Sequence, residues 1–478
     1  MKKLFVVFAL ILAFTLTTVS LSATAADLPA DVKQALEANK LSADYLGVWV
    51  QAVDSDKPLL THNPDLPLNP ASVMKLVTSL AALDMLGPTY TWPTEVFANG
   101  PIKQGVLKGD LFIKGYGDPW FRTEDLWRLV RQVRELGIHT IEGRLILDDS
   151  YFAPVDEDPA AFDNRPSRPY NALPRALLLD NRLTRFVVQP DAETGAIRVN
   201  MWPPQPSVSL INQIEPDAGL CTDKTGWPVV DIRNGGDFDT VRLSGRYSLN
   251  CGVRDFYRVV GNPDESFFKG FEALFSERGG VIRGGYGKGV VPSDAKLLFV
   301  QESQTLAEYL QPINKFSNNV MARQVFLTIG AQQMAPPATT LKAQQAIEAW
   351  LNSLGLKFPE FVIENGSGLS RIARISPRNM ATLLKYGWES PTMPEFISSM
   401  PIIGVDGTMR RRLQGDSVSG RGHFKTGTLR DVRAGAGYIM SRSGRRYIVV
   451  IMHNQPAVQL GGGTQVQDAI IKWVYDNG

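Results

Sequence analysis

The chain has 478 residues, of which 44% are hydrophobic, 9% aromatic and 21% charged. This length exceeds that of one typical domain and predicts two or three compact units, and the composition is that of a globular enzyme rather than a disordered chain. The formal net charge of +2 gives no reason to expect a nucleic acid or an anionic membrane as a partner.

The first 25 residues have the pattern of an export signal. Lys2 and Lys3 precede an apolar run over residues 4–16, and the small residues 23–25 are typical of a cleavage site. The run is short for a membrane span, although an uncleaved N-terminal anchor is the alternative interpretation. We therefore predict an exported protein whose mature chain begins at residue 26.

The next predicted elements are a short helix, a hairpin and a longer helix. Residues 31–39 have a helical pattern. Residues 45–53 alternate like a strand, residues 54–57 form a turn, and residues 58–61 return as a second strand. An apolar helix then begins near Ser72 and stops at residues 87–88, Gly-Pro. Lys75 follows Ser72 by one helical turn and shares its face. Such a pair suits a lysine that takes the proton of a serine nucleophile, provided that the lysine is partly desolvated.

The middle of the chain differs from its two ends in composition and sequence pattern. From about residue 93 to residue 288 it is rich in short strand-like runs, prolines and glycines, with amphipathic helices predicted over 124–136 and 265–278. We expect two inserted modules. The assigned ranges are 93–165 with 252–288 for the first module and 166–251 for the second.

The second inserted module contains both cysteines of the chain, Cys221 and Cys251. An exported protein meets an oxidising compartment, which favours a disulfide between them. Two buried free thiols are the alternative, and the sequence separation leaves it open.

The last part of the chain contains strand-like segments that we expect to pair with the first hairpin. Residues 434–440 and 447–452 flank a turn, and residues 464–475 close the chain as a helix. Strands from both ends predict one antiparallel sheet flanked by helices, so the fold class is mixed α/β (α+β). The corresponding discontinuous domain comprises residues 26–92 and 289–478.

The pattern S-x-x-K at Ser72 is weak by itself, and its meaning depends on two companions. S-x-N occurs at residues 317–319, and K-T-G occurs at residues 425–427. Serine enzymes that use a lysine in this way carry the three motifs in this order. The order therefore favours a single catalytic site.

Each motif also has a second copy that context excludes. These copies begin at Ser293, Ser248 and Lys224 and run in the reverse order. Ser293 follows a proline and precedes a strand-like run, so it does not open a helix. The second K-T-G is followed by Trp227-Pro228, and proline disrupts the strand that this motif needs.

With these motifs in order, the chain resembles the serine penicillin-binding proteins, specifically the exported D-alanyl-D-alanine carboxypeptidase/endopeptidase class with a large insertion between the first two motifs. Further family-like stretches are G-D-L-F-I-K-G-Y-G-D-P at 109–119, I-N-K-F-S-N-N at 313–319, E-N-G-S-G-L-S-R at 364–371, P-I-I-G-V-D-G-T-M-R-R-R-L at 401–413 and K-T-G-T-L at 425–429. Asn365 stands where the family usually carries aspartate. The resemblance implies a transpeptidase-like domain with two smaller inserted domains and a periplasmic location.

The resemblance also implies the catalytic roles. Ser72 would be the acylated nucleophile and Lys75 its base. Ser317 would relay a proton to the leaving amine, and Asn319 would orient the substrate amide and Lys75. Lys425 would add positive potential.

The expected substrate-binding residues are Thr426, Gly427, Thr428 and Asp148. The hydroxyls of Thr426 and Thr428 would meet the terminal carboxylate, and the backbone N–H groups of Ser72 and Thr428 would form the oxyanion hole. Asp148 matches a family position that faces the substrate's side-chain amine. Its alternative is a turn-forming role at the end of a strand.

The expected activity is hydrolysis of D-Ala-D-Ala in peptidoglycan stem peptides, with β-lactams as covalent inhibitors. No metal or cofactor is expected, because serine–lysine chemistry needs none and the four histidines form no H-E-x-x-H pattern. The alternatives are a β-lactamase of the same fold and a silent scaffold that binds the cell wall. The oligomeric state stays open.

Overall fold

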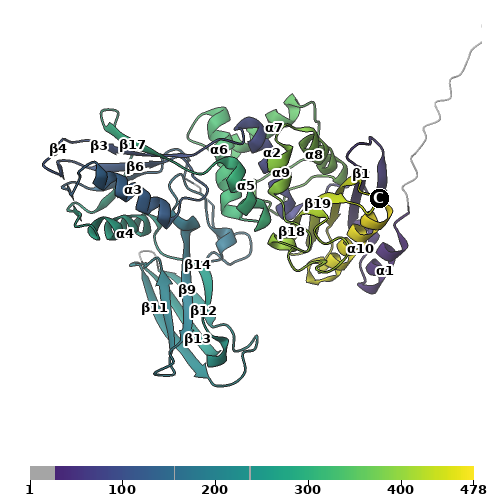
Figure 1. Cartoon of the computed structure of the whole chain (residues 1–478), viewed down its shortest axis with the longest axis horizontal. Helices are drawn as coiled ribbons and strands as arrows, with labels where there is room; N and C mark the ends of the chain where they lie inside the picture. The colour runs from purple at the N-terminus through teal and green to yellow at the C-terminus, as the bar shows by residue number, and fades with distance from the viewer. Residues whose placement is uncertain (1–26, 155–156, 236–237) are drawn as a thin grey trace, which may run out of the picture.

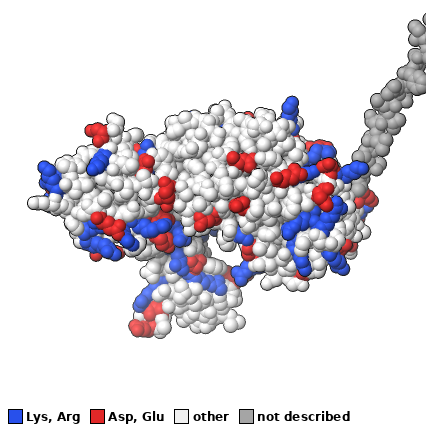
Figure 2. Space-filling view, turned by 45° about the horizontal axis from the view of Figure 1, so that its top comes forward, with Lys and Arg blue, Asp and Glu red and all other residues white. Residues whose placement is uncertain are grey.

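The computed structural model describes residues 27–154, 157–235 and 238–478 (Figure 1). The predicted export signal lies outside the described residues. Within the described part of the chain, no helix has both the length and the apolar character needed to span a membrane. On the face shown in Figure 2, acidic and basic side chains mix toward the two ends, and the upper middle is largely uncharged.

The first region is a five-stranded antiparallel sheet made from both ends of the chain, in the order β18-β19-β20-β1-β2 (Figure 1). Its strands are β1 (Leu46–Ala52), β2 (Pro58–His62), β18 (Gly422–Leu429), β19 (Val432–Met440) and β20 (Arg446–His453). The antiparallel sheet predicted from the two hairpins is confirmed, because β1 pairs with β20 along its whole length.

Helices cover both faces of this sheet. The helices α1 (Ala30–Ala38) and α10 (Gly462–Asn477) pack against one face, and α2 (Met74–Met85) and α8 (Pro377–Glu389) pack against the other. Because both faces are covered, β1 is buried at every position instead of alternating. The other helices of this region are α5 (Leu306–Lys315), α6 (Asn319–Met334), α7 (Thr340–Ser353) and α9 (Met393–Ser398).

The first inserted region is built on a second five-stranded sheet, in the order β16-β8-β6-β3-β17. Its helices α3 (Thr123–Glu135) and α4 (Pro263–Ser276) match the two predicted amphipathic helices and share one apolar core with it. The strands of this sheet are β3 (Pro93–Ala98), β6 (Leu111–Gly115), β8 (Leu145–Asp148), β16 (Tyr286–Lys288) and β17 (Lys296–Glu302). A small sheet beside it contains β4 (Ile102–Lys103), β5 (Val106–Leu107), β7 (Thr140–Ile141) and β15 (Val281–Ile282).

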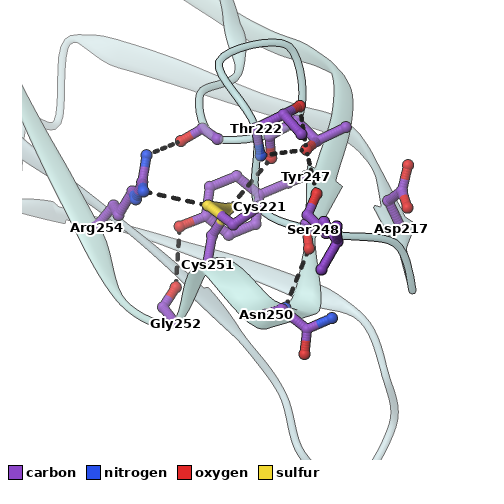
Figure 3. The surroundings of a disulfide bond; sticks show 12 residues. Asp217, Cys221, Thr222, Tyr247, Ser248, Asn250, Cys251, Gly252 and Arg254 are labelled. Atoms are coloured by element: carbon purple, nitrogen blue, oxygen red, sulfur yellow. Dashed lines mark hydrogen bonds between the residues drawn. A yellow bond between two sulfur atoms is a disulfide. The ribbon is translucent and has the colours of Figure 1, made fainter.

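The second inserted region contains two three-stranded sheets, β10-β9-β14 and β11-β13-β12, around their own apolar core. The strands are β9 (Leu183–Pro190), β10 (Ile197–Trp202), β11 (Val208–Asp217), β12 (Val229–Gly235), β13 (Phe238–Ser248) and β14 (Arg254–Val259). A disulfide joins Cys221 and Cys251 in this region, and Arg254 Nη2 lies 3.1 Å from Cys221 Sγ (Figure 3).

Two strands fall on the other side of the expected module boundaries. Residues 296–302 form β17, which pairs with β3 of the first inserted sheet rather than joining the terminal sheet. Residues 254–259 form β14, which pairs with β9 of the second inserted region. Each strand pairs with a strand that lies far earlier in the sequence. Local sequence patterns do not reveal such long-range pairing.

Candidate active site

Ser72 lies in a single 3₁₀ turn (Ala71–Val73) that leads into α2. The helix predicted to begin near Ser72 therefore begins at Met74, after this turn. Ala71 adopts a left-handed φ of 46°, which is costly for a residue with a side chain. The carbonyl oxygen of the Asn69 side chain accepts a hydrogen bond from the Ala71 N–H at 2.8 Å and holds the turn.

Lys75 is fully buried, and its ammonium group contacts three neutral acceptors. Lys75 Nζ donates hydrogen bonds to Ser72 Oγ at 3.1 Å, to Asn319 Oδ1 at 2.6 Å and to the Ser367 carbonyl at 2.5 Å. Burial and the nearby charge of Lys425 hold the pKa of Lys75 well below its usual range. Both effects favour the neutral amine form of Lys75 over the charged form.

The second and third motifs meet on the other side of the site. Ser317 lies between α5 and α6 with a left-handed φ of 59°. Lys425 of β18 donates hydrogen bonds from Nζ to Ser317 Oγ and to the Thr426 carbonyl, both at 2.8 Å. Burial lowers the pKa of Lys425 to about 7. The structure thus brings Ser72, Lys75 and Asn319 into one hydrogen-bonded group and Ser317 and Lys425 into another.

Gly427 lets β18 approach the turn that carries Ser72. A Cβ atom at this position would lie 2.6 Å from the Pro70 carbonyl oxygen and 3.0 Å from the Ser72 nitrogen. Only glycine therefore allows this approach without a shift of the backbone. Thr426 and Thr428 precede and follow Gly427 in β18, and Thr428 is exposed.

The sequence analysis missed the contribution of the loop that contains residues 364–371. Its Ser367 carbonyl accepts a hydrogen bond from Lys75, and a Cβ atom on Gly368 would lie 1.9 Å from the Ala71 carbonyl oxygen. Asn365 accepts from Ser367 Oγ at 2.8 Å and donates to the Leu369 carbonyl at 2.8 Å. An aspartate cannot make that donation when ionised, so the amide suits this loop. The glycines at 366 and 368 were the available signal.

Asp148 lies at the end of β8, and its carboxylate is used inside the protein. The side chain is fully buried, and its oxygens accept hydrogen bonds from the N–H groups of Ser150 at 2.9 Å and Val291 at 2.8 Å. The cations Arg175 and Lys288 line the same cavity of about 550 Å³. These contacts favour the turn-forming alternative over contact with a substrate amine.

A smaller cavity of about 270 Å³ is lined in part by the loop whose Ser367 carbonyl contacts Lys75, and it was not anticipated from the sequence. Its lining includes the acidic residues Glu157 and Asp158. Phe162 and Arg371 also line it, and the Arg371 guanidinium stacks over the Phe162 ring, 4.2 Å from the ring centroid. The carbonyl of Tyr170 accepts a hydrogen bond from Asn319 Nδ2 at 3.2 Å. The next residue, Asn171, lines the cavity. The cavity therefore continues the site past Asn319.

Comparison with known proteins identifies the family of this chain. Residues 28–476 match the model of the D-Ala-D-Ala carboxypeptidase 3 (S13) family. A D-alanyl-D-alanine carboxypeptidase from an Actinomadura species is 30% identical over 93% of this chain and 84% of its own. A Haemophilus influenzae D-alanyl-D-alanine carboxypeptidase is 24% identical over 85% of this chain and 84% of its own.

Solved structures show the same fold. The crystal structure of penicillin-binding protein 4 from Haemophilus influenzae superimposes with a TM-score of 0.78 at 22% identity and covers 93% of this chain and 99% of its own. A second structure of that protein, in complex with a β-lactam, gives a TM-score of 0.75 at 22% identity and covers 94% of this chain and 100% of its own. Since the family model spans nearly all the described residues, the chain belongs to the D-Ala-D-Ala carboxypeptidase 3 (S13) family, within the serine penicillin-binding proteins.

Proposed function

We propose that this carboxypeptidase hydrolyses the terminal D-Ala-D-Ala bond of peptidoglycan stem peptides through an acyl-enzyme on Ser72. The observation that carries the proposal is the hydrogen bond from a fully buried Lys75 to Ser72 Oγ. A lysine surrounded by neutral acceptors and repelled by another cation is a base rather than a permanent charge.

The acylation step uses the two groups of side chains in turn. Lys75 takes the proton from Ser72 Oγ, and the oxygen attacks the carbonyl carbon of the penultimate D-alanine. The backbone N–H groups of Ser72 and Thr428 stabilise the negative charge that forms on the carbonyl oxygen. The C–N bond then breaks, and Ser317 relays the proton held by Lys75 to the leaving amine of D-alanine. In the second half, Lys75 takes a proton from the water that attacks the ester and returns it to Ser72 Oγ as the acyl group leaves.

The same serine is placed to open a β-lactam ring. Attack on the ring carbonyl breaks the ring C–N bond, but the amine stays attached to the acyl group and obstructs the approach of water. We therefore expect slow hydrolysis of a bound β-lactam. Rapid turnover would favour the β-lactamase alternative, and absence of acylation would favour the scaffold.

Lys425 predicts a particular pH dependence. With its pKa lowered to about 7, it is charged below that pH and loses its positive charge as the pH rises through it. Since kcat/KM reports groups of the free enzyme, kcat/KM should fall on the alkaline side with an apparent pKa of about 7. Lys425→Arg keeps a charge at higher pH and should remove this alkaline limb, although with lower activity. An unchanged limb in that variant would assign it to another group.

Asp148 should act on stability rather than on substrate choice. Asp148→Asn replaces one acceptor oxygen with an NH₂ group, which cannot accept from the N–H of Ser150 or Val291, depending on its orientation. We expect a loss of about 1–3 kcal/mol in the free energy of unfolding, measured by chemical denaturation. Activity on stem peptides and on short D-Ala-D-Ala mimics should change by the same factor. A selective loss for stem peptides would restore the substrate-contact hypothesis.

The amine at the far end of the stem peptide has another candidate partner in the smaller cavity. Asp158 brings a carboxylate there, and a carboxylate is the natural partner of an ammonium group. Glu157 is already paired with Arg323, whose Nη2 lies 2.6 Å from Glu157 Oε2. We propose that this cavity receives the peptide's side chain. The enzyme would act after export, and cross-linked peptides that enter the same cavity would give endopeptidase activity.

Mass spectrometry of products from purified muropeptides tests this function. Loss of one D-alanine from a pentapeptide stem identifies the carboxypeptidase, and conversion of cross-linked dimers into monomers identifies the endopeptidase. Neither product in a preparation that is folded and contains the intact chain would contradict the proposal.

A further inference from the structure

Arg433 lies directly across a strand pair from Thr428. In the antiparallel pair of β18 and β19, Thr428 is opposite Arg433, so the two side chains lie on the same face of the sheet. Arg433 Nη1 donates a hydrogen bond to Thr428 Oγ1 at 2.6 Å. Thr428 is exposed, at the position where the proposed reaction needs a hydroxyl for the terminal carboxylate.

The direction of this hydrogen bond fixes the role of the Thr428 hydroxyl. A hydroxyl carries one hydrogen and two lone pairs, and a guanidinium only donates. Because Thr428 Oγ1 accepts from Arg433, its own hydrogen is left to donate. An ionised carboxylate only accepts, so Arg433 turns the hydroxyl into the donor that a peptide carboxylate requires.

Arg433 also supplies a positive charge that persists to higher pH than that of Lys425. Burial, with the charge of Arg412, lowers the pKa of Arg433 only to about 10, so the group stays protonated at neutral pH. Lys425 has a pKa of about 7, and the pKa of Lys75 also lies well below its usual range. At neutral pH the guanidinium beside Thr428 therefore carries a full positive charge.

The guanidinium of Arg433 is incompletely paired within the protein. Among the described residues, its hydrogen-bond partner is the neutral hydroxyl of Thr428, and its buried Nε has no partner. Arginine is suited to carboxylates because it offers several donors in one plane. An arginine held in this way, next to an exposed hydroxyl, is arranged for an anion that comes from outside the protein.

We propose that Arg433 is a positioning residue for the C-terminal carboxylate of the peptide. It orients the Thr428 hydroxyl and places a permanent positive charge beside the carboxylate of the D-alanine that leaves. Arg433 then determines how strongly the enzyme prefers a free terminal carboxylate. The inference rests on the proposed function, because it assumes that the peptide terminus lies at Thr428.

Two substrates that differ only at the terminus test this inference. An N-acylated D-Ala-D-Ala peptide with a free carboxylate is compared with its C-terminal carboxamide, and kcat/KM is measured for both. Arg433→Ala should lower kcat/KM for the acid by about ten- to a hundredfold and leave the amide almost unchanged. Arg433→Lys keeps the charge and should recover part of the preference for the acid.

The matched control is Arg446→Ala. Arg446 is exposed and pairs with Met440, at the end of β19 away from Thr428, so both substrates should be unaffected. Where Arg433→Ala does not fold, Arg433→Gln is compared with Arg433→Lys in the same way. Equal losses for acid and amide, or no loss for the acid, would overturn the inference. A wild-type enzyme that cleaves neither peptide would contradict the proposed function instead.

Discussion

Ser72→Ala should abolish release of D-alanine, with kcat lowered by about three to six orders of magnitude. The variant keeps Lys75, Asn319 and both companion motifs but has no oxygen for attack on the peptide carbonyl. Its free energy of unfolding should change by less than about 1 kcal/mol, because Ser72 is only half-buried. The measurement is D-alanine released per enzyme from an acylated D-Ala-D-Ala peptide.

The chain contains its own control for this experiment. Ser293 begins the second S-x-x-K copy and is exposed, so Ser293→Ala should leave kcat and kcat/KM unchanged. Activity that survives in Ser72→Ala, or that disappears in Ser293→Ala, would contradict the choice of nucleophile.

Lys75→Met should lower the rate of acylation of Ser72 by about 10²- to 10⁴-fold, which is the usual contribution of a positioned general base. Methionine is unbranched and fills most of the buried space, but it cannot take the Ser72 proton. It also leaves the Asn319 amide oxygen and the Ser367 carbonyl without the donor that they have now. The measurement is the rate of acylation by labelled penicillin under single-turnover conditions.

Lys296→Met is the matched control for Lys75→Met. Lys296 is the exposed lysine of the second S-x-x-K copy, and its replacement should not change the acylation rate. In Lys75→Met, the acid limb of the pH profile should also disappear, because the wild-type rate rises with pH as Lys75 loses its proton. A full acylation rate with the wild-type pH profile would exclude Lys75 as the base.

The terminal sheet and the order of the motifs were predictable from the sequence because both depend on local patterns. The strands of the two hairpins carry their hydrophobic pattern in short segments, and the structure has them as β1, β2, β19 and β20. The three motifs are short runs whose chemistry depends on residue type. Context around each copy, such as the proline after the second K-T-G, was enough to choose between them.

The rest of the site depends on contacts between segments that are distant in the sequence. Ser367 contributes a backbone carbonyl, which no side-chain pattern marks. Arg433 is opposite Thr428 only because of the register of β18 and β19. Asp148 was chosen by its position in a family-like stretch, and its burial and its hydrogen bond to Val291 depend on how β8 packs.

Mapping the covalent adduct of penicillin on the wild-type protein tests the central claim most directly. The enzyme is trapped with labelled penicillin, digested, and the modified peptide is identified by tandem mass spectrometry. A single adduct on Ser72, absent from Ser72→Ala, is the result expected from the hydrogen bond between Lys75 and Ser72. An adduct on Ser293 or another serine, or a folded protein that forms no adduct, would contradict it.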